Sequence, residues 1–336
     1  MRLCTLGKTS EGCSHCSPEV ASSQNMITRQ LGTNGPHLTE IGFGAWAIGG
    51  AWEYGWGPTD DAESVKAIHR AFDLGINWID TAAVYGLGHS EEVVAKAVQG
   101  KRHQVFIATK CAQVWDGKGN VRTHLSPQSI RREITDSLQR LKTDYIDLYQ
   151  LHWPDPHTPV EDSWQEMVRL KNEGKVRHIG VCNFGADLLK RCETIAHVQS
   201  LQPIYNLLER EVERDVLPYC KSHGIGVVAY SPMQSGLLTG SFDITKLAPD
   251  DWRITHSEKF REPKYSRGLR LVEQLRPIAE KYKTTVGQLA VAWVLMNDAV
   301  TSAIVGARNA HQVEKNAAAS GWKISDADME TISRLL

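Results

Sequence analysis

Residues 75–91 carry a carboxylate and a phenol at a spacing that suits catalysis. The pattern predicts a buried strand that ends at Asp80, followed by a glycine-bearing turn that carries Tyr85. A helix is expected to begin at Ser90, with Glu91 in its first turn. An ionisable residue at the end of an apolar strand, with a phenol in the next loop, is typical of an active site at a strand-to-helix connection.

Two later apolar strands also end in ionisable residues, at Lys110 and His152. Neighbouring strands lie about 4.8 Å apart, so these side chains converge on Asp80 if all three point into the same interior. The two-residue period of a strand places Ala108 inside together with Lys110, and turns the β-branched Thr109 outward against helices. A purely structural salt bridge between Asp80 and Lys110 is the alternative, but three ionisable residues at one barrel end favour a functional site.

Lys110 beside Tyr85 indicates a proton donor. A phenol has a pKa of about 10, whereas a proton donor at neutral pH works best with a pKa near about 7. We expect the Lys110 ammonium to lower the pKa of Tyr85 by about two or three units, or about 3–4 kcal/mol, while Asp80 keeps the ammonium charged. His152 is expected to hydrogen-bond the substrate oxygen or relay the proton. With no nucleophile or metal beside this acid, we expect proton donation to a carbonyl oxygen, with a nicotinamide as hydride source.

The composition is that of an ordinary globular protein of 336 residues, 41% hydrophobic and 23% charged, long enough for two domains or one large barrel. The formal net charge of -1 gives no basic surplus, so a nucleic-acid partner is not expected. No apolar run approaches the roughly 18 residues of a membrane span. We therefore expect a cytoplasmic protein that acts on a small molecule, and the oligomeric state is left open.

The seven cysteines do not form a disulfide framework. Four of them fall within expected strands or helices, where a reduced thiol is usual: Cys111, Cys182, Cys192 and Cys220. The other three lie in residues 1–25, where Cys13 and Cys16 have the spacing of zinc ligands but no matching second pair follows. We therefore predict no metal site and a disordered leader over residues 1–25. A start at Met26 and a transit peptide are alternatives for this leader.

Strand and helix patterns alternate along the rest of the chain. Strands are expected at residues 41–46, 78–81, 105–111, 146–152, 178–183, 201–205, 227–231 and 302–306. Helices are expected at residues 62–74, 90–98, 127–141, 161–172, 186–196, 212–222, 269–281, 286–296, 310–318 and from 327 onward. About eight strand–helix units favour a single (β/α)8 TIM barrel over residues 26–336, with an N-terminal hairpin that turns at Asn34-Gly35 and extra helices near the C-terminus.

The glycines argue against a doubly wound nucleotide-binding sheet. That fold places a G-x-G-x-x-G motif after its first strand, and neither Gly49-Gly50 nor the pair Gly86 and Gly88 forms one. A barrel instead holds phosphate at the loops after its seventh and eighth strands. The long loop at residues 238–264 carries several basic residues that could fold over a phosphate-bearing ligand, although exposed charge on a surface loop is the more frequent explanation.

These residues, in this order, resemble the aldo-keto reductase superfamily over residues 27–336, and most closely its bacterial general-stress branch. The resemblance is carried by five motifs: Gly75-x-Asn77-x-x-Asp80-Thr81-Ala82, Tyr85-Gly86-x-Gly88-x-Ser90-Glu91, Thr109-Lys110, Leu151-His152-Trp153-Pro154 and Gly180-Val181-Cys182-Asn183-Phe184. It implies a barrel reductase that uses NADPH, with Asp80, Tyr85, Lys110 and His152 as its catalytic tetrad and Tyr85 as the acid.

The same resemblance implies a set of cofactor-binding residues. They are Ala45, Trp46, Cys182, Asn183, Gln202, Tyr230, Ser231, Met233, Ser235, Gly236, Gly306, Arg308, Gln312 and Asn316. Arg308 is the natural partner of a 2′-phosphate because its guanidinium pairs bidentately. Cys182 stands where the family usually has serine, and Lys315 where it often has glutamate, so NADH remains an alternative to NADPH.

Tryptophans near the expected active end indicate an aromatic pocket for aldehydes and ketones with apolar bodies. We assign Trp52, Trp115 and Trp153 to it, with core packing as the alternative. Two other functions remain open. One is an NADP(H)-binding regulatory subunit resembling potassium-channel β-subunits, and the other is a phosphate-binding barrel isomerase.

Overall fold

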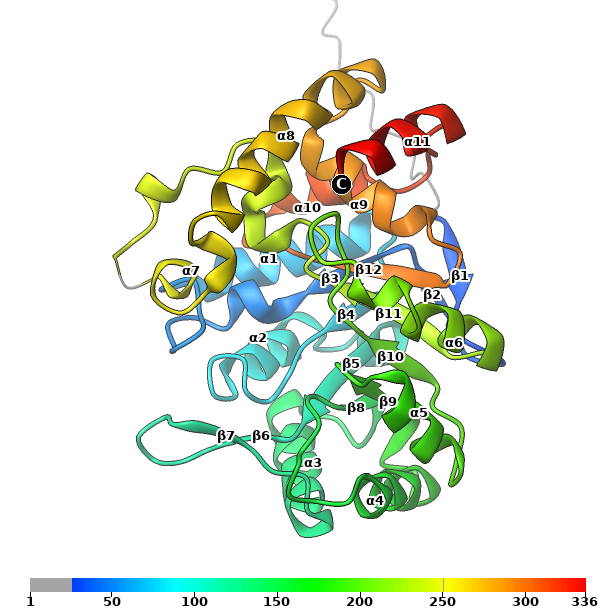
Figure 1. Ribbon diagram of the computed structural model, residues 1–336. Coiled ribbons are helices and arrows are strands. Elements are labelled where there is room, and N and C mark those ends of the chain that lie inside the picture. Colours follow the sequence, from blue (N-terminus) through cyan, green and yellow to red (C-terminus); the bar gives the residue numbers. More distant parts are fainter. Residues whose placement is uncertain (1–25, 250) are drawn as a thin grey trace, which may run out of the picture.

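The computed structural model describes residues 26–249 and 251–336, in which eight parallel strands close into a barrel (Figure 1). The barrel strands are β3 (Ile41–Gly44), β4 (Trp78–Asp80), β5 (Phe106–Cys111), β8 (Ile146–Leu151), β9 (Val176–Cys182), β10 (Ser200–Gln202), β11 (Gly226–Tyr230) and β12 (Val300–Gly306). The expected (β/α)8 architecture is therefore confirmed. The predicted leader at residues 1–25, with its cysteines, lies outside the described residues.

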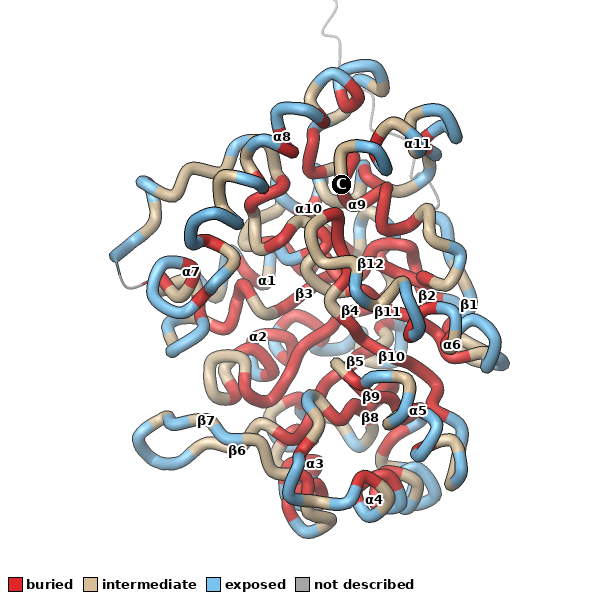
Figure 2. Tube along the Cα trace, viewed as in Figure 1, coloured by how far each residue is buried: buried red, intermediate tan, exposed pale blue. Residues whose placement is uncertain are grey.

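Helices cover the outside of the barrel and show their polar faces to solvent, as the exposed outer turns in Figure 2 illustrate. They are α1 (Asp61–Asp73), α2 (His89–Ala97), α3 (Pro127–Leu141), α4 (Val160–Asn172), α5 (Ala186–Glu193), α6 (Val216–His223), α7 (Trp252–Thr255), α8 (Lys264–Lys281), α9 (Val286–Met296), α10 (Ala310–Ala317) and α11 (Asp326–Leu335). In α3, Ile130, Ile134 and Leu141 recur at helical spacing and are buried. None of these helices is long and apolar enough to cross a membrane.

The sequence predictions match most elements to within a few residues, and the differences have local causes. The helix expected at 212–222 begins only at Val216, after a 3-10 turn over Glu211–Glu213. The first barrel strand ends at Gly44, where the chain turns into the 3-10 helix Ala45–Ile48. The long loop at 238–264 is not wholly irregular, because it contains the short helix α7.

A small hairpin of β1 (Thr28–Gln30) and β2 (His37–Thr39) precedes the barrel, as expected. Of the predicted turn pair, Asn34 has a positive φ of 60° and Gly35 does not. The hairpin residues Leu31 and Leu38 pack on the buried Trp78 inside the barrel. The Trp78 indole Nε1 also donates to the Thr39 carbonyl oxygen at 3.2 Å. The hairpin thus closes the end of the barrel at which the strands begin.

The strand alternation predicted for β5 is correct. Ala108 joins Leu148, Val228 and Ile304 in the apolar cluster of the interior. Ile107 instead belongs to the larger core between strands and helices, on the opposite face of the strand. Lys110 shares the inward face of Ala108 and reaches the other end of the barrel.

A second hairpin, formed by β6 (Gln113–Trp115) and β7 (Val121–Thr123), was not predicted from the sequence. It follows β5 directly and projects from the body of the protein on the side of α7, away from β1 and β2 (Figure 1). The turn between its strands is organised by Asp116, which accepts hydrogen bonds from the backbone of Lys118 and Asn120. The hairpin forms a wall at the carboxyl ends of the strands.

The packing of Trp78 generates a stability prediction. A Cβ atom added at Gly42 would lie 2.2 Å from two ring atoms of Trp78. We expect Gly42→Ala to lower the free energy of unfolding by about 1–3 kcal/mol, because the barrel interior has no room to move this ring. Chemical denaturation measures the change. Gly117→Ala, where nothing lies within 4 Å, is the matched control, and an equal loss in the two variants contradicts the prediction.

Candidate active site

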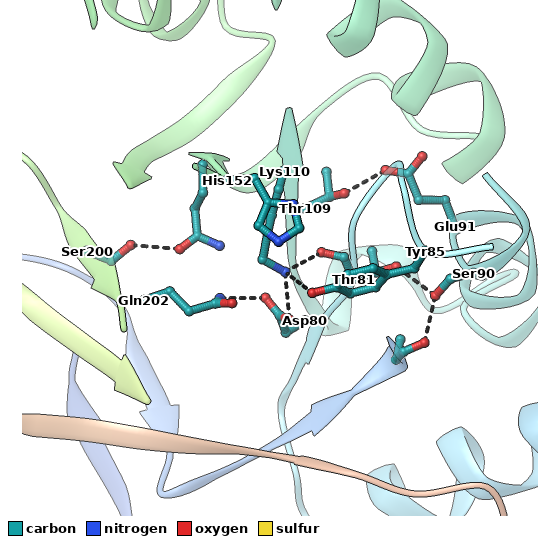
Figure 3. Close-up of polar contacts among 12 residues, drawn as sticks. Asp80, Thr81, Tyr85, Ser90, Glu91, Thr109, Lys110, His152, Ser200 and Gln202 are labelled. Atoms are coloured by element: carbon teal, nitrogen blue, oxygen red, sulfur yellow. Dashed lines mark hydrogen bonds and ion pairs between the residues drawn. The ribbon is translucent and has the colours of Figure 1, made fainter. Parts of the chain in front are cut away.

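The Lys110 ammonium is the centre of the site (Figure 3). Its Nζ donates to Asp80 Oδ2 and to the Thr81 carbonyl oxygen, both at 2.8 Å, and to the Tyr85 hydroxyl oxygen at 3.2 Å. Lys110 is 1% exposed and Asp80 3% exposed. The structure therefore brings together the carboxylate, ammonium and phenol that the sequence placed on two strands and a loop.

This arrangement leaves the phenol proton free. An ammonium has three donors and no acceptor, and all three donors of Lys110 are used. Tyr85 therefore accepts a hydrogen bond from Lys110, and its own O–H remains available to donate to a ligand. Because Tyr85 lines the cavity and Lys110 does not, the only donor of the pair within reach of a ligand is Tyr85.

The turn that carries Tyr85 depends on glycine. Gly86 has a φ of +63°, and a Cβ atom at this position would lie 1.8 Å from the Gly49 carbonyl oxygen. Both the left-handed conformation and the close backbone contact favour glycine over every other residue. The loop after β4 can therefore pack directly on the loop after β3.

The predicted lowering of the pKa of Tyr85 is wrong for this geometry. Burial raises the pKa of Tyr85 to about 12, although the Lys110 charge acts in the opposite direction. Burial also raises the pKa of Asp80 against the effect of Lys110. For Lys110 the burial penalty is outweighed by the Asp80 carboxylate and Tyr85, so its pKa is raised and the ammonium stays charged. Tyr85 is thus protonated throughout the neutral range.

His152 follows β8 and approaches Tyr85 edge to face, with ring centroids 5.8 Å apart. Burial and the nearby Lys110 charge hold the pKa of His152 well below its usual value. Its imidazole is therefore neutral near pH 7 and acts as a neutral hydrogen-bonding group.

A continuous cavity of about 1250 Å3 opens above these residues. At one end it is bounded by Asp80, Tyr85 and His152. At the other end it reaches the loop before α9 and the start of α10, at residues such as Thr284 and Gln312. Among the described residues, no group of three or more His, Cys, Asp or Glu side chains could hold a metal.

Most of the residues expected to bind a cofactor line this cavity. They are Trp46, Asn183, Gln202, Tyr230, Ser231, Met233, Ser235, Gly236, Gly306, Gln312 and Asn316. Ala45, Cys182 and Arg308 do not line it. Ala45 and Cys182 are fully buried. The Arg308 guanidinium donates to the Trp56 carbonyl oxygen and lies over the Trp56 ring.

The two amides expected to hold a carboxamide already have partners. Asn183 donates to the His152 carbonyl oxygen at 3.1 Å and accepts from the Tyr230 hydroxyl at 3.0 Å. Gln202 donates to Asp80 Oδ1 at 2.8 Å. Each amide keeps a second N–H and further lone pairs, so these bonds orient the side chains without exhausting them.

The loop after β11 carries several left-handed residues, with φ of 55° at Ser231, 52° at Ser235 and 100° at Gly236. The fully buried Asn206 holds it by donating to the Ser231 carbonyl oxygen at 3.0 Å and to the side chain of Gln234 at 3.2 Å. The Asn206 side chain, from the preceding strand–helix unit, therefore holds the backbone along this part of the cavity.

Two of the three tryptophans assigned to the substrate pocket line the cavity, and one does not. Trp52 and Trp153 line the cavity beside Tyr85, whereas Trp115 does not. Its ring instead faces the Arg140 guanidinium at 5.9 Å, a favourable cation–π contact. The sequence analysis missed other lining residues at this end: Tyr54, Val84, Gln113, Val121, Thr123 and Pro154. The alternating pattern at 113–115 and 121–123, with glycines between, was the available signal for the hairpin.

The sequence analysis also missed lining residues at the end of the cavity near α9 and α10. Arg276, Thr284, Thr285, Gly287, Gln288 and Lys315 line the cavity there. Thr285 and Gln288 form a capping box at the start of α9. Such a motif marks the start of a helix, but it does not reveal in the sequence that the helix end lies beside a cavity.

The sequence model of the "Aldo/keto reductase family" matches residues 40–336. The chain therefore belongs to the aldo-keto reductase family, and it is an oxidoreductase of this class. The "Aldo-keto reductase YhdN" of Bacillus subtilis is 40% identical over 309 residues, which cover 91% of this chain and 92% of that protein. The expected kinship with bacterial members is confirmed.

Two further similar proteins have names that describe an activity. The "NADH-specific methylglyoxal reductase" of Escherichia coli is 37% identical over 313 residues, covering 89% of this chain and 94% of that protein. The solved structure of the glycerol dehydrogenase AKR11B4 from Gluconobacter oxydans is 38% identical, has a TM-score of 0.83, and covers 92% of this chain and 94% of its own.

A second buried ionisable group, Glu133, lies on α3 and bonds to the backbone just after β5. Glu133 on α3 is 7% exposed, and its carboxylate accepts from the Ala112 backbone N–H at 2.9 Å and the Ser129 hydroxyl at 3.0 Å. Burial raises the pKa of Glu133 to about 7, despite these hydrogen bonds. The folded protein therefore holds a proton on Glu133 that the unfolded chain releases near its usual pKa of 4.5.

This shift predicts a pH dependence of stability. Between pH 4.5 and about 7 the folded state binds more protons at Glu133 than the unfolded state does. The free energy of unfolding therefore keeps its full contribution from Glu133 below pH 4.5 and decreases by about 3 kcal/mol as the pH rises through this window. Glu133→Gln is neutral throughout. We expect the stability difference between the two proteins, measured by urea unfolding, to change across the window in favour of the variant. Parallel curves contradict the prediction.

Proposed function

We propose that this protein reduces aldehydes and some ketones to alcohols with NADPH, with Tyr85 as the general acid. The observation that carries the proposal is the fully bonded Lys110 ammonium, which leaves the Tyr85 O–H as the free donor at the cavity wall. Aldo-keto reductases bind nicotinamide cofactors, and the relatives named for methylglyoxal and glycerol act on small neutral molecules.

The charge of the cavity lining suits a dinucleotide. Away from Asp80 its wall carries four basic side chains, Arg253, Lys259, Arg276 and Lys315, and one acidic side chain, Glu280. This surplus favours a phosphate-bearing ligand. The backbone and hydroxyl groups around Ser235 and the end of β12 would hold the phosphates and the adenosine, and Asn183, Gln202 and Tyr230 would hold the nicotinamide.

The nicotinamide supplies a hydride when it is bound. Tyr85 donates its proton to the substrate carbonyl oxygen as negative charge develops there. The Lys110 ammonium, 3.2 Å from the phenol oxygen, stabilises the phenolate that remains. Neutral His152 donates a second hydrogen bond to the same substrate oxygen. Asp80 does not contact substrate in this scheme but keeps Lys110 charged.

The end of the cavity near Tyr85 favours neutral substrates with apolar bodies. Apart from the tetrad, its lining side chains are aromatic, aliphatic or uncharged polar groups, such as Trp52, Val84, Thr123 and Trp153. A carboxylate-bearing substrate would find no cationic partner in this lining. We further propose that residues 26–336 work as one barrel domain in the cytoplasm, with a small carbonyl compound as the partner.

Tyr85→Phe tests the proposed function. We expect this variant to bind NADPH as the wild type does, by fluorescence titration, and to lose roughly 10²–10⁴-fold in kcat for aldehyde reduction, because only the acid is removed. Tyr145→Phe, whose ring lies between Arg102 and Arg177, is the matched control and should keep full activity. A wild-type protein that binds NADPH without turnover on an aldehyde and ketone panel favours a regulatory subunit. No NADPH binding favours an isomerase.

Arg308→Gln tests the cofactor preference. If the guanidinium leaves Trp56 to pair with the 2′-phosphate, the variant should bind NADPH about tenfold more weakly while its affinity for NADH stays unchanged, since charge-assisted hydrogen bonds contribute about 1.5–3 kcal/mol. Isothermal titration with both cofactors measures the ratio. An equal loss of affinity for the two cofactors, or no loss for either, shows that Arg308 does not bind the 2′-phosphate.

A further inference from the structure

The first turn of α2 holds a buried carboxylate to which the proposed mechanism gives no task. Glu91 is 0% exposed. One carboxylate oxygen accepts from Arg140 Nε at 2.7 Å. The other accepts from the Thr109 hydroxyl at 2.6 Å, the contact drawn in Figure 3. The ion pair with Arg140 offsets the cost of burying the charge. It does not require the second oxygen to contact Thr109, which is the residue directly before Lys110.

The neighbouring Ser90 makes an equivalent contact with the other catalytic strand. Its hydroxyl lies 2.9 Å from the hydroxyl of Thr81, the residue directly after Asp80, and donates to the Ala45 carbonyl oxygen at 2.9 Å. The Ser90 backbone N–H also donates to the Tyr85 carbonyl oxygen at 3.1 Å. One helical turn is therefore bonded to the Tyr85 loop and to residues adjacent to both members of the ion pair.

We propose that Glu91, acting through Thr109, is a positioning residue that holds Lys110 at hydrogen-bonding distance from Tyr85. This inference rests on the proposed reductase function. Because Thr109 faces outward and Lys110 inward, a bond that anchors Thr109 to α2 sets how far the Lys110 side chain must reach. The Tyr85 contact of 3.2 Å is the longest of the three Lys110 bonds. It lies at the upper end of the usual range, so a shift of a few tenths of an ångström removes it first.

Thr109→Val isolates this link. Valine keeps the shape and the β-branching of threonine, and the ion pair of Glu91 with Arg140 remains. The charged and titratable groups that face Tyr85 also remain: Asp80 from β4, Lys110 from β5, His152 after β8 and Cys182 from β9. A change in the pH dependence of the reaction then reports on the distance between Lys110 and Tyr85.

We expect Thr109→Val to lower kcat for aldehyde reduction about tenfold, with KM and the NADPH dissociation constant changed less than about twofold. In alcohol oxidation, the rising limb of the pH profile should move to higher pH, because a more distant ammonium stabilises the Tyr85 phenolate less. Thr301→Val, on β12, is the matched control: its threonine is buried and its hydroxyl donates to the Gln30 carbonyl oxygen.

Wild-type kcat and an unshifted pH profile in folded Thr109→Val overturn the proposal. So does an equal loss in kcat in Thr301→Val, which would indicate general destabilisation. If Thr109→Val does not fold by circular dichroism, Thr109→Ala is measured by the same criteria. It also lacks the hydroxyl that bonds to Glu91, and unchanged kcat and pH dependence in that variant also overturn the proposal. A wild-type protein without turnover contradicts the proposed function instead, so the two failures are distinguishable.

Discussion

The buried ion pair between Lys110 and Asp80 is the interaction on which the rest of the site depends. An ammonium with almost no exposure is stable only if each of its donors finds an acceptor. Lys110 meets that requirement with Asp80, the Thr81 carbonyl and the Tyr85 hydroxyl. The same three bonds that make burial tolerable orient the phenol toward the cavity. The bonds that stabilise the buried Lys110 charge are therefore the same bonds that orient the Tyr85 phenol.

The barrel supports this pair from two sides. On the inside, Gln202 donates to the second Asp80 oxygen, so the carboxylate has a partner on each oxygen. On the outside, the first turn of α2 contacts the strands through Ser90 and Glu91. The closed barrel gives each of these partners a fixed distance, and this is why the Asp80, Lys110 and Glu91 charges can be buried here with partners.

The high pKa of Tyr85 determines when its proton can be transferred. With a pKa of about 12, the Tyr85 phenol is protonated throughout the neutral range, and in the proposed reaction it gives up its proton only as charge develops on the substrate oxygen. In that proposal Lys110 stabilises the phenolate formed by the transfer more than it affects the resting phenol. The cavity divides its tasks in a similar way, with uncharged aromatic walls near Tyr85 and basic side chains toward the far end.

The sequence alone determined the alternation of strands and helices, the identity of the residues at the strand ends, and the inward direction of Lys110, because these follow from local periodicity. Tertiary structure decided the rest. The sign of the Tyr85 pKa shift depends on burial, which no local pattern reports. The hairpin at 113–123 and the capping box at Thr285 have local signals, yet their placement beside the cavity comes only from the packing of distant segments. Trp115 and Arg308 do not line the cavity: Trp115 contacts Arg140, and Arg308 donates to the Trp56 carbonyl oxygen.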